Sequence, residues 1–237
     1  MGDASSTEIL GRVHRNQYGT EAAQSIADSL AALGPAPSSA PGPEQALETF
    51  LDRLAINQVT VQAASGRSDA VKAIARFMYE THNTHRVVAG NDPRLAALPW
   101  RDGGVLVRFD KANQDDPVSI SYARLGVAET GSLLLYSNRD NPASNNWLVQ
   151  DHIIVMDVRD LVGSLADAWQ QVRKDYADAP LPRGVHFISG PSSTGDIIGH
   201  LVKGAHGPQQ VHLVLIGHID RDLLVQTGHS SPSAVAD

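Results

Sequence analysis

The chain has 237 residues, enough for one large domain, and its 42% hydrophobic and 19% charged residues are typical of a globular protein. A formal net charge of −7 argues against nucleic-acid binding, which depends on clustered lysine and arginine. These residues include no cysteine, which excludes disulfides, cysteine nucleophiles and iron–sulfur clusters bound through this chain's own thiolates. Apolar runs are only strand-sized, and the first ten residues carry acids where a signal peptide needs basic residues. We therefore expect no membrane span and a cytoplasmic location.

Residues 1–43 predict an N-terminal helical appendage followed by a linker. Apolar residues recur loosely at helical spacing over 7–33. The stretch 34–43 contains four of the chain's 13 prolines and is typical of an extended linker. The appendage either packs on the same core or reaches a partner, and it makes a homodimer possible.

From residue 44 onward, strand-like runs alternate with amphipathic helical patterns. The runs lie at 59–64, 86–90 and 104–109. Two helical stripes are formed by Leu47, Phe50, Leu51 and Leu54, and by Val71, Ile74, Ala75 and Met78. This alternation predicts an α/β fold, with a mostly parallel sheet and helices on both faces.

The second half of the chain has more closely spaced strand candidates. Those at 118–122, 127–128 and 132–136 allow a hairpin or meander. A nearly continuous apolar run at 151–158 indicates a strand buried on both faces. Apolar residues at helical spacing then predict a helix over 158–176 that follows this strand directly.

The last elements are expected to return the chain to the same sheet. We predict a strand at 184–190, a helix at 194–202 and a strong strand at 211–217. The α/β domain then covers 44–220, and the polar tail at 221–237 is expected to be disordered.

The segment GVAETGSL at 126–133 is the first candidate functional motif. It lies between two apolar runs, and Gly131 can adopt the positive φ of a tight turn. A hairpin turn with a solvated carboxylate explains it structurally. Alternatively, Glu129 is an acid–base group in a cleft, with the Thr130 and Ser132 hydroxyls as substrate contacts.

The second candidate is SGPSSTGD at 189–196, which follows a predicted strand and opens a predicted helix. Amides at a helix N-terminus favour anions, so this segment is a candidate anion site. Four hydroxyl residues are crowded there: Ser189, Ser192, Ser193 and Thr194. Ser193 and Asp196 also have the spacing of a capping box, which alone explains both residues.

The third candidate is KGAHGP at 203–208. His206, flanked by small residues, could act as an acid, a base or a hydrogen-bond donor. A helix C-terminus capped by Gly204, with His206 favoured by the helix dipole, explains the same residues structurally. The ten histidines show no metal-binding pattern, so we expect neither a metal nor a cofactor.

In order and spacing, these motifs resemble those of the LUD-domain family of lactate-utilisation proteins, in its LutC branch. The matching segments are AETGSL (128–133), SGPSSTGDI (189–197) and KGAHGP (203–208). The resemblance implies a fold like that of ribose-5-phosphate isomerase and the CoA-transferases. It also implies a part in oxidising L-lactate to pyruvate alongside iron–sulfur partner subunits.

The motifs together supply the candidate site residues. Glu129 and His206 are the catalytic candidates. The candidates for binding a small carboxylate or phosphate are Thr130, Ser132, Ser189, Ser192, Ser193, Thr194 and Asp196. We expect these groups to line one cleft at the carboxyl ends of the strands. Where the family has arginine in its GPSRT motif, this chain has Ser193, which removes a guanidinium clamp.

Three function classes stay open from the sequence. The first is a non-redox component of a lactate-oxidising system that binds a small carboxylate or a partner subunit. The alternative is a free-standing isomerase, CoA-transferase or cyclo-ligase type enzyme acting on a phosphorylated or carboxylated small molecule, with Glu129 as base or nucleophile. A purely structural assembly protein is a third possibility.

Overall fold

The computed structural model describes residues 20–34, 39–197 and 200–229. The chain divides into two units, Met1–Ser38 and Ser39–Asp237. The first contains helix α2 (Thr20–Leu33), which bears out the helical patterning over those residues. The expected helix before residue 20 lies outside the described residues.

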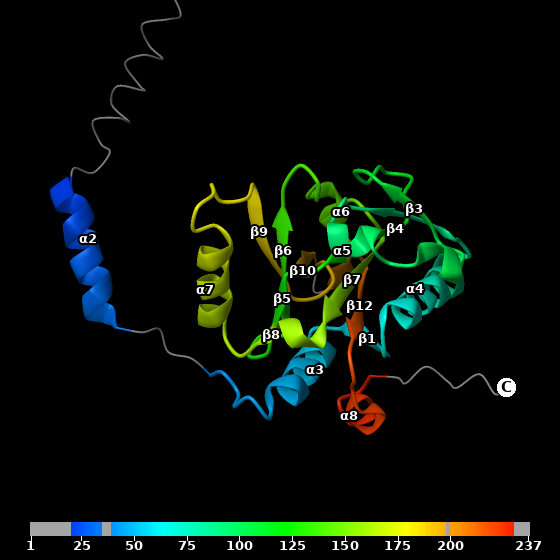
Figure 1. Ribbon diagram of the computed structural model, residues 1–237, viewed down its shortest axis with the longest axis horizontal. Helices are drawn as coiled ribbons and strands as arrows, with labels where there is room; N and C mark the ends of the chain where they lie inside the picture. The colour runs from blue at the N-terminus through cyan, green and yellow to red at the C-terminus, as the bar shows by residue number, and fades with distance from the viewer. Residues whose placement is uncertain (1–19, 35–38, 198–199, 230–237) are drawn as a thin grey trace, which may run out of the picture. The chain divides into compact units, whose positions relative to one another are not determined.

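A six-stranded, all-parallel sheet forms the centre of the second unit, and its strand order is β1-β12-β7-β4-β2-β3 (Figure 1). Its strands are β1 (Val59–Ala64), β2 (Arg86–Ala89), β3 (Leu106–Phe109), β4 (Val118–Tyr122), β7 (Asp151–Asp157) and β12 (Gln210–Ile216). The apolar β7 pairs with β12 on one side and β4 on the other, which explains why both of its faces are buried. The α/β fold with a mostly parallel sheet is confirmed.

One face of this sheet is covered by α4 (Arg67–His82), α5 (Pro93–Ala96) and the 3-10 helix η1 (Trp100–Gly103). The apolar stripe of α4 faces the sheet because its members recur at helical spacing, and Ile74 and Met78 are fully buried there. Trp100 is buried in the core on this face, and its Nε1 donates to Leu95 O over 2.8 Å.

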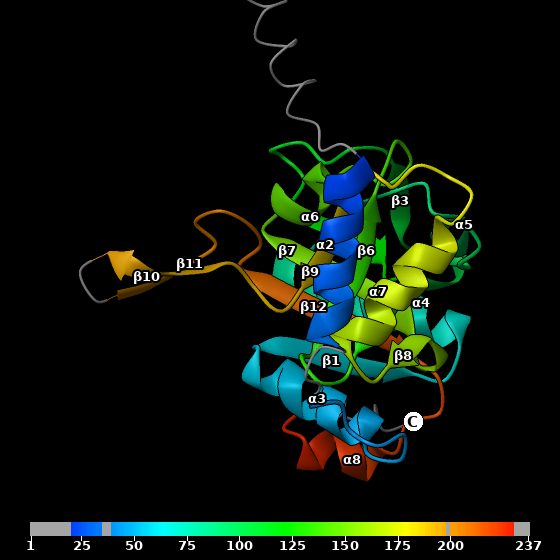
Figure 2. The same cartoon turned by 90° about the vertical axis from the view of Figure 1, so that its left-hand side faces the viewer.

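The other face is covered by α3 (Ala46–Ile56), α8 (Arg221–Gln226) and a second sheet. That sheet has the order β8-β5-β6-β9, with β5 (Leu125–Val127), β6 (Ser132–Ser137), β8 (Leu161–Val162) and β9 (Gly184–Ile188). Helix α7 (Leu165–Asp175) packs on its outer face through Ala168 and Val172 (Figure 2). Two sheets are therefore stacked between α4 and α7.

Two elements in or next to the second sheet differ from the sequence-based prediction. The helix expected over 158–176 begins only at Leu165, after the 3-10 helix η2 (Val158–Asp160) and β8. Ser164 starts it with a capping box shared with Asp167, a signal that the longer apolar stripe obscured. The strand expected at 184–190 is present as β9, but it pairs antiparallel with β6 and not in the parallel sheet.

The helix predicted over 194–202 is wrong. β10 (Ser193–Ile197) and β11 (His200–Lys203) form an antiparallel hairpin that projects from the sheets (Figure 2). Ser192 N donates to Pro208 O and Gly204 N donates to Ser192 O, both over 2.8 Å, which ties the two arms together at their base. The expected anion site therefore has no helix N-terminus to supply its amides, and binding of an anion by these residues stays a prediction.

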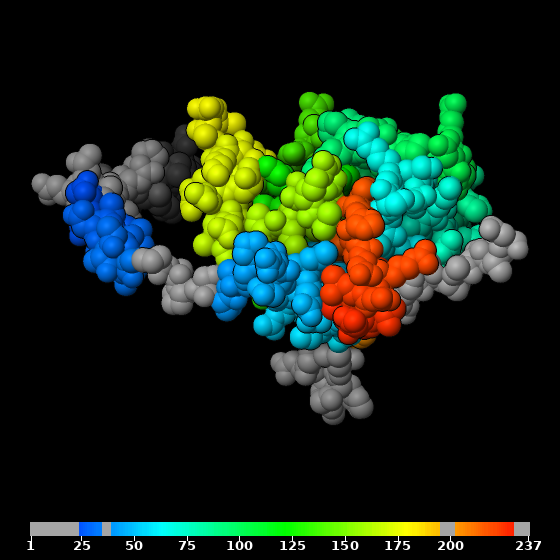
Figure 3. Space-filling model, turned by 60° about the horizontal axis from the view of Figure 1, so that its bottom comes forward, coloured from blue at the N-terminus to red at the C-terminus, as the bar shows by residue number. Residues whose placement is uncertain are grey.

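The tail is also more ordered than its composition indicates. Asp220 caps α8, and Leu224 is buried against the α3 side of the core. His229 Nε2 approaches Leu51 O to 2.9 Å, and α3 and α8 lie side by side on the surface (Figure 3). Disorder from residue 221 onward is therefore wrong, and residues 230–237 lie outside the described part of the chain.

Candidate functional site

A row of three hydroxyls connects the first two sequence motifs. Thr130 Oγ1 lies 2.8 Å from Ser132 Oγ, which lies 2.7 Å from Ser189 Oγ. The row forms because the β5–β6 turn brings Thr130 next to the start of β6, which pairs with the end of β9. Gly131 has the positive φ, +66°, that the tight turn predicted. We call Thr130, Ser132 and Ser189 the hydroxyl row.

The C-terminal end of α3 holds the hydroxyl row in place. Asn57 Nδ2 donates to Thr130 O over 2.9 Å. A Cβ added to Gly190 would collide with Asn57 O, so the second motif can approach α3 only through a glycine. Because Asn57 is two residues before β1, the row lies near the amino-terminal edge of the parallel sheet.

The second and third motifs meet at the same edge. His206 N donates to Ser192 Oγ over 3.3 Å, and Gln209 N donates to Gln150 O over 2.7 Å. Gln150 and Gln209 directly precede β7 and β12. An open groove of about 700 Å³ lies beside His206 and is also lined by Trp147. Ser192 and His206 therefore lie at the amino ends of β7 and β12, and their expected position at the carboxyl ends of the parallel strands is wrong.

The remaining predicted residues are less closely connected to these groups. Glu129 is half-buried in the β5–β6 turn, and its amide donates to Gly163 O over 3.1 Å. On β10, Ser193 is exposed and Thr194 is half-buried. The side chain of Asp196 lies outside what the structure describes, so a single cleft containing Glu129 and Asp196 stays a prediction.

A polar cavity of about 240 Å³, missed by the sequence analysis, lies at the carboxyl ends of β2 and β4. Its walls include Asn91, Arg94, Ser121, Tyr122, Arg124, Tyr136, Asn141 and Asn146. Chain connections leave β2 and β4 in opposite directions, which is where open α/β sheets bind ligands. The asparagine-rich NPASNNW at 141–147 was the available signal, but no motif marks it.

One wall of the polar cavity forms where the backbone at the end of β2 lies close to the loop at 138–141. A side chain at Gly90 would collide with Asn141, and Asn91 N donates to Asp140 O over 2.7 Å. Asn138 Oδ1 accepts from the amides of Asp140 and Asn141, each over 2.8 Å. The loop therefore has an internal turn and is fastened to the end of β2.

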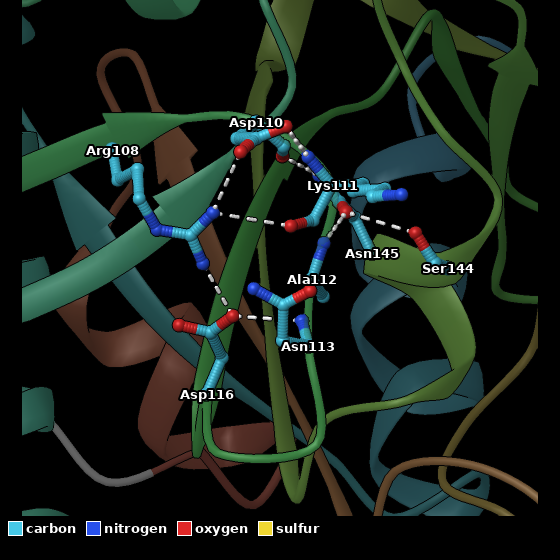
Figure 4. A network of polar contacts seen from close by, with 8 residues as sticks. All are labelled: Arg108, Asp110, Lys111, Ala112, Asn113, Asp116, Ser144 and Asn145. Atoms are coloured by element: carbon cyan, nitrogen blue, oxygen red, sulfur yellow. Dashed lines mark hydrogen bonds and ion pairs between the residues drawn. The ribbon is translucent and has the colours of Figure 1, made fainter.

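A network next to the cavity fixes the short helix α6 (Ser144–Trp147) (Figure 4). Asn145 Oδ1 accepts from Ala112 N over 2.7 Å, and Asn145 Nδ2 donates to Asp110 O over 3.1 Å. Arg108 joins the carboxylates of Asp110 and Asp116 across the same loop. This network positions α6, and with it Asn146.

Beneath the cavity, a buried chain of hydrogen bonds reaches Asn146. His152 Nε2 lies 2.9 Å from Ser121 Oγ, which lies 3.3 Å from Asn146 Oδ1. The amide oxygen only accepts, so the Ser121 hydroxyl donates to it and His152 donates to Ser121. Burial lowers the pKa of His152 to about 3, so the imidazole is neutral near pH 7.

The arginines lining the cavity are already paired. Arg94 forms a two-point contact with Asp92, and its guanidinium lies 4.2 Å from the centre of the Tyr122 ring. Arg124 forms a two-point contact with Asp175. Burial raises the pKa of Tyr122, which keeps its phenol protonated.

The described ranges contain no group of three or more histidine, aspartate or glutamate residues placed to hold a metal ion. None of the helices described there has the length and apolar character needed to cross a membrane.

Comparison with known proteins places the motifs in a family. Residues 108–216, which include all three motifs, match the model of the LUD domain. The Lactate utilization protein C of Exiguobacterium sp. is 28% identical over 182 residues, which cover 73% of this chain and 78% of that protein. The proteins of the same name from Oceanobacillus iheyensis and Bacillus subtilis are each 30% identical, over 42% and 45% of this chain. Those two matches span only 43% and 44% of the relatives' own lengths.

A solved structure supports the fold. The crystal structure of a DUF162 family protein from Deinococcus radiodurans has a TM-score of 0.52 and is 16% identical, covering 75% of this chain and 99% of that one. The three sequence motifs lie within the matched segment, and the fold similarity covers 75% of the chain. Residues 108–216 therefore match the LUD domain, and the chain is similar to the proteins named Lactate utilization protein C.

Proposed function

We propose that this chain is a non-redox component of a cytoplasmic system that oxidises L-lactate to pyruvate, together with partner subunits that carry iron–sulfur clusters. The observation that carries the proposal is the LUD-domain match together with relatives named for lactate utilisation. The 237 residues contain no cysteine, so the partners would supply the thiolates that bind a cluster.

We further propose that the hydroxyl row and the Ser192–His206 contact belong to the surface that binds a small carboxylate or a partner subunit. Hydroxyls donate hydrogen bonds to carboxylate oxygens, and the two ends of the row, Thr130 and Ser189, are partly exposed and exposed, respectively, with Ser132 buried between them. In this proposal Glu129 and His206 act as acid–base groups. Ser193, Thr194 and Asp196 contribute from β10.

Growth on L-lactate tests both proposals. The gene is deleted in the host and replaced by wild type, Glu129→Gln or His206→Ala, with L-lactate as the sole carbon source. We expect the deletion strain and both variants to fail to grow, while circular dichroism shows that both variants fold. Glu80→Gln and His218→Ala are matched controls at exposed positions and should restore growth.

Each contrary outcome has a distinct meaning. Normal growth of the deletion strain contradicts the lactate function. Normal growth of both variants contradicts the proposed site but leaves the function intact. Oxidation of lactate by the purified chain alone contradicts the accessory role, and turnover of a phosphorylated or acyl substrate favours the free-standing enzyme.

A further inference from the structure

We propose that the polar cavity between β2 and β4 is a second binding site, which takes a small, neutral, hydroxyl-rich molecule about the size of a pentose. It lies at the carboxyl ends of the parallel strands, whereas the Ser192–His206 contact lies at the amino ends of β7 and β12. The two sites are therefore separate, and this proposal does not depend on the lactate function.

The size of the cavity limits the ligand. Its volume is about 240 Å³. One water occupies about 30 Å³ in the liquid, so the cavity has room for roughly eight waters or one ligand of about ten non-hydrogen atoms. A pentose has this size, whereas a nucleotide or a coenzyme is far too large.

The polar groups favour hydroxyls as ligands. Asn146 is only 5% exposed, and its Oδ1 already accepts from Ser121. Among the described residues its Nδ2 makes no hydrogen bond, and the residue lines the cavity. Asn91 and Asn141 also line the cavity, and an amide, like a hydroxyl, both donates and accepts.

The charges argue against an anion. The two lining arginines, Arg94 and Arg124, are held by Asp92 and Asp175. Asp140 is a second carboxylate in the wall beside Asp92, so two carboxylates balance the two lining arginines. Asp175 neutralises Arg124 from outside the wall. A carboxylate or phosphate would have to displace an existing ion pair, whereas a neutral hydroxyl would not.

The Asn146 donor is held in position before a ligand arrives. His152 is fully buried and neutral, and its chain of hydrogen bonds through Ser121 holds Asn146 Oδ1. On the other side, the Asn145 contacts with the 110–112 loop fix α6 (Figure 4). Such support lowers the entropy lost on binding.

Calorimetric titration of the full chain tests the proposal. The neutral probes are glycerol, erythritol and D-ribose, and the anionic probes are L-lactate and D-ribose 5-phosphate. We expect D-ribose to bind with a Kd of about 1 mM or tighter, and about tenfold or more tightly than either anion. The proposal is overturned if every neutral probe fails to bind at about 10 mM, or if an anion binds more tightly than D-ribose.

Variants locate the binding. Asn146→Asp keeps the shape but removes the N–H donors, and it should weaken D-ribose binding about tenfold or more. Asn113→Asp makes the same change at an exposed position outside the cavity wall and should bind as wild type does. Asn91→Trp narrows the cavity from an exposed position and gives the same test if Asn146→Asp does not fold. Unchanged affinity in both cavity variants contradicts the site, whatever the growth test on L-lactate shows.

Discussion

At the scale of single residues, two buried histidines stand out. His212 Nδ1 lies 2.7 Å from Thr60 Oγ1, and its ring stacks on Phe77 with the centroids 4.2 Å apart. His152 is bonded to Ser121, and in each ring the other nitrogen has no partner in the described part of the chain. Burial lowers the pKa to about 3 for His152 and about 4 for His212, so both are neutral in the folded protein near pH 7.

These histidines should make the protein less stable in mild acid. Below pH 6.5 the unfolded chain takes up protons that the folded chain does not, so the free energy of unfolding falls as the pH falls. The loss is up to about 1.4 kcal/mol per pH unit for each histidine. It ends near pH 4 for His212 and near pH 3 for His152.

Urea unfolding between pH 7 and pH 4.5 measures this effect. His212→Gln should flatten the pH dependence, because one group that titrates only in the unfolded state is removed. His218→Gln, at an exposed position, should leave the slope unchanged. A free energy of unfolding that stays constant over this range contradicts the effect.

At the scale of elements, the junction between β9 and α3 depends on one glycine. Gly190 has a φ of +129°, and a Cβ there would collide with Asn57 O. Gly190→Ala should therefore lower the free energy of unfolding by about 2 kcal/mol or more, because strain and collision add.

The same substitution at Gly66 is the control for this prediction. Gly66 is extended, with φ at −173°, and no atom lies within 4 Å of an added Cβ. Gly66→Ala should change the free energy of unfolding by no more than about 0.5 kcal/mol in a urea melt. Equal losses in the two variants would contradict the packing of Gly190 on α3.

At the scale of the whole molecule, α2 carries an apolar stripe that predicts self-association. Ile26, Leu30 and Leu33 recur at helical spacing and are exposed. Light scattering should give about twice the chain mass of 25.3 kDa, because pairing two stripes removes them from water.

Charge placed on this stripe tests the dimer. Leu30→Glu should return the mass to 25.3 kDa, while Gln24→Glu on the opposite side of α2 should leave the dimer intact. A wild-type mass of 25.3 kDa would contradict the expected homodimer.

The sequence alone was sufficient for the α/β class and for most strands of the parallel sheet. β1, β2, β7 and β12 are short apolar runs, and their local pattern permits little else. The order and spacing of the three motifs also led to the LUD domain, because those residues are recognisable without their neighbours.

Tertiary contacts decided what the local pattern left ambiguous. The residues at 194–202 suit a helix or a strand by apolar spacing, and the pairing of Ser192 with Pro208 and Gly204 selects the hairpin. β9 joins the second sheet because β6 offers it an antiparallel edge, which periodicity does not show.

For the candidate sites, too, the sequence named some of the residues and the tertiary structure decided which of them meet. The sequence named the hydroxyls of Thr130, Ser132 and Ser189, but only the pairing of β6 with β9 brings them into one row. The polar cavity was missed because its walls come from three separate stretches, near 90–94, 121–124 and 135–146. They meet only because β2 and β4 are neighbours in the sheet, and strand order depends on long-range packing that no local pattern encodes.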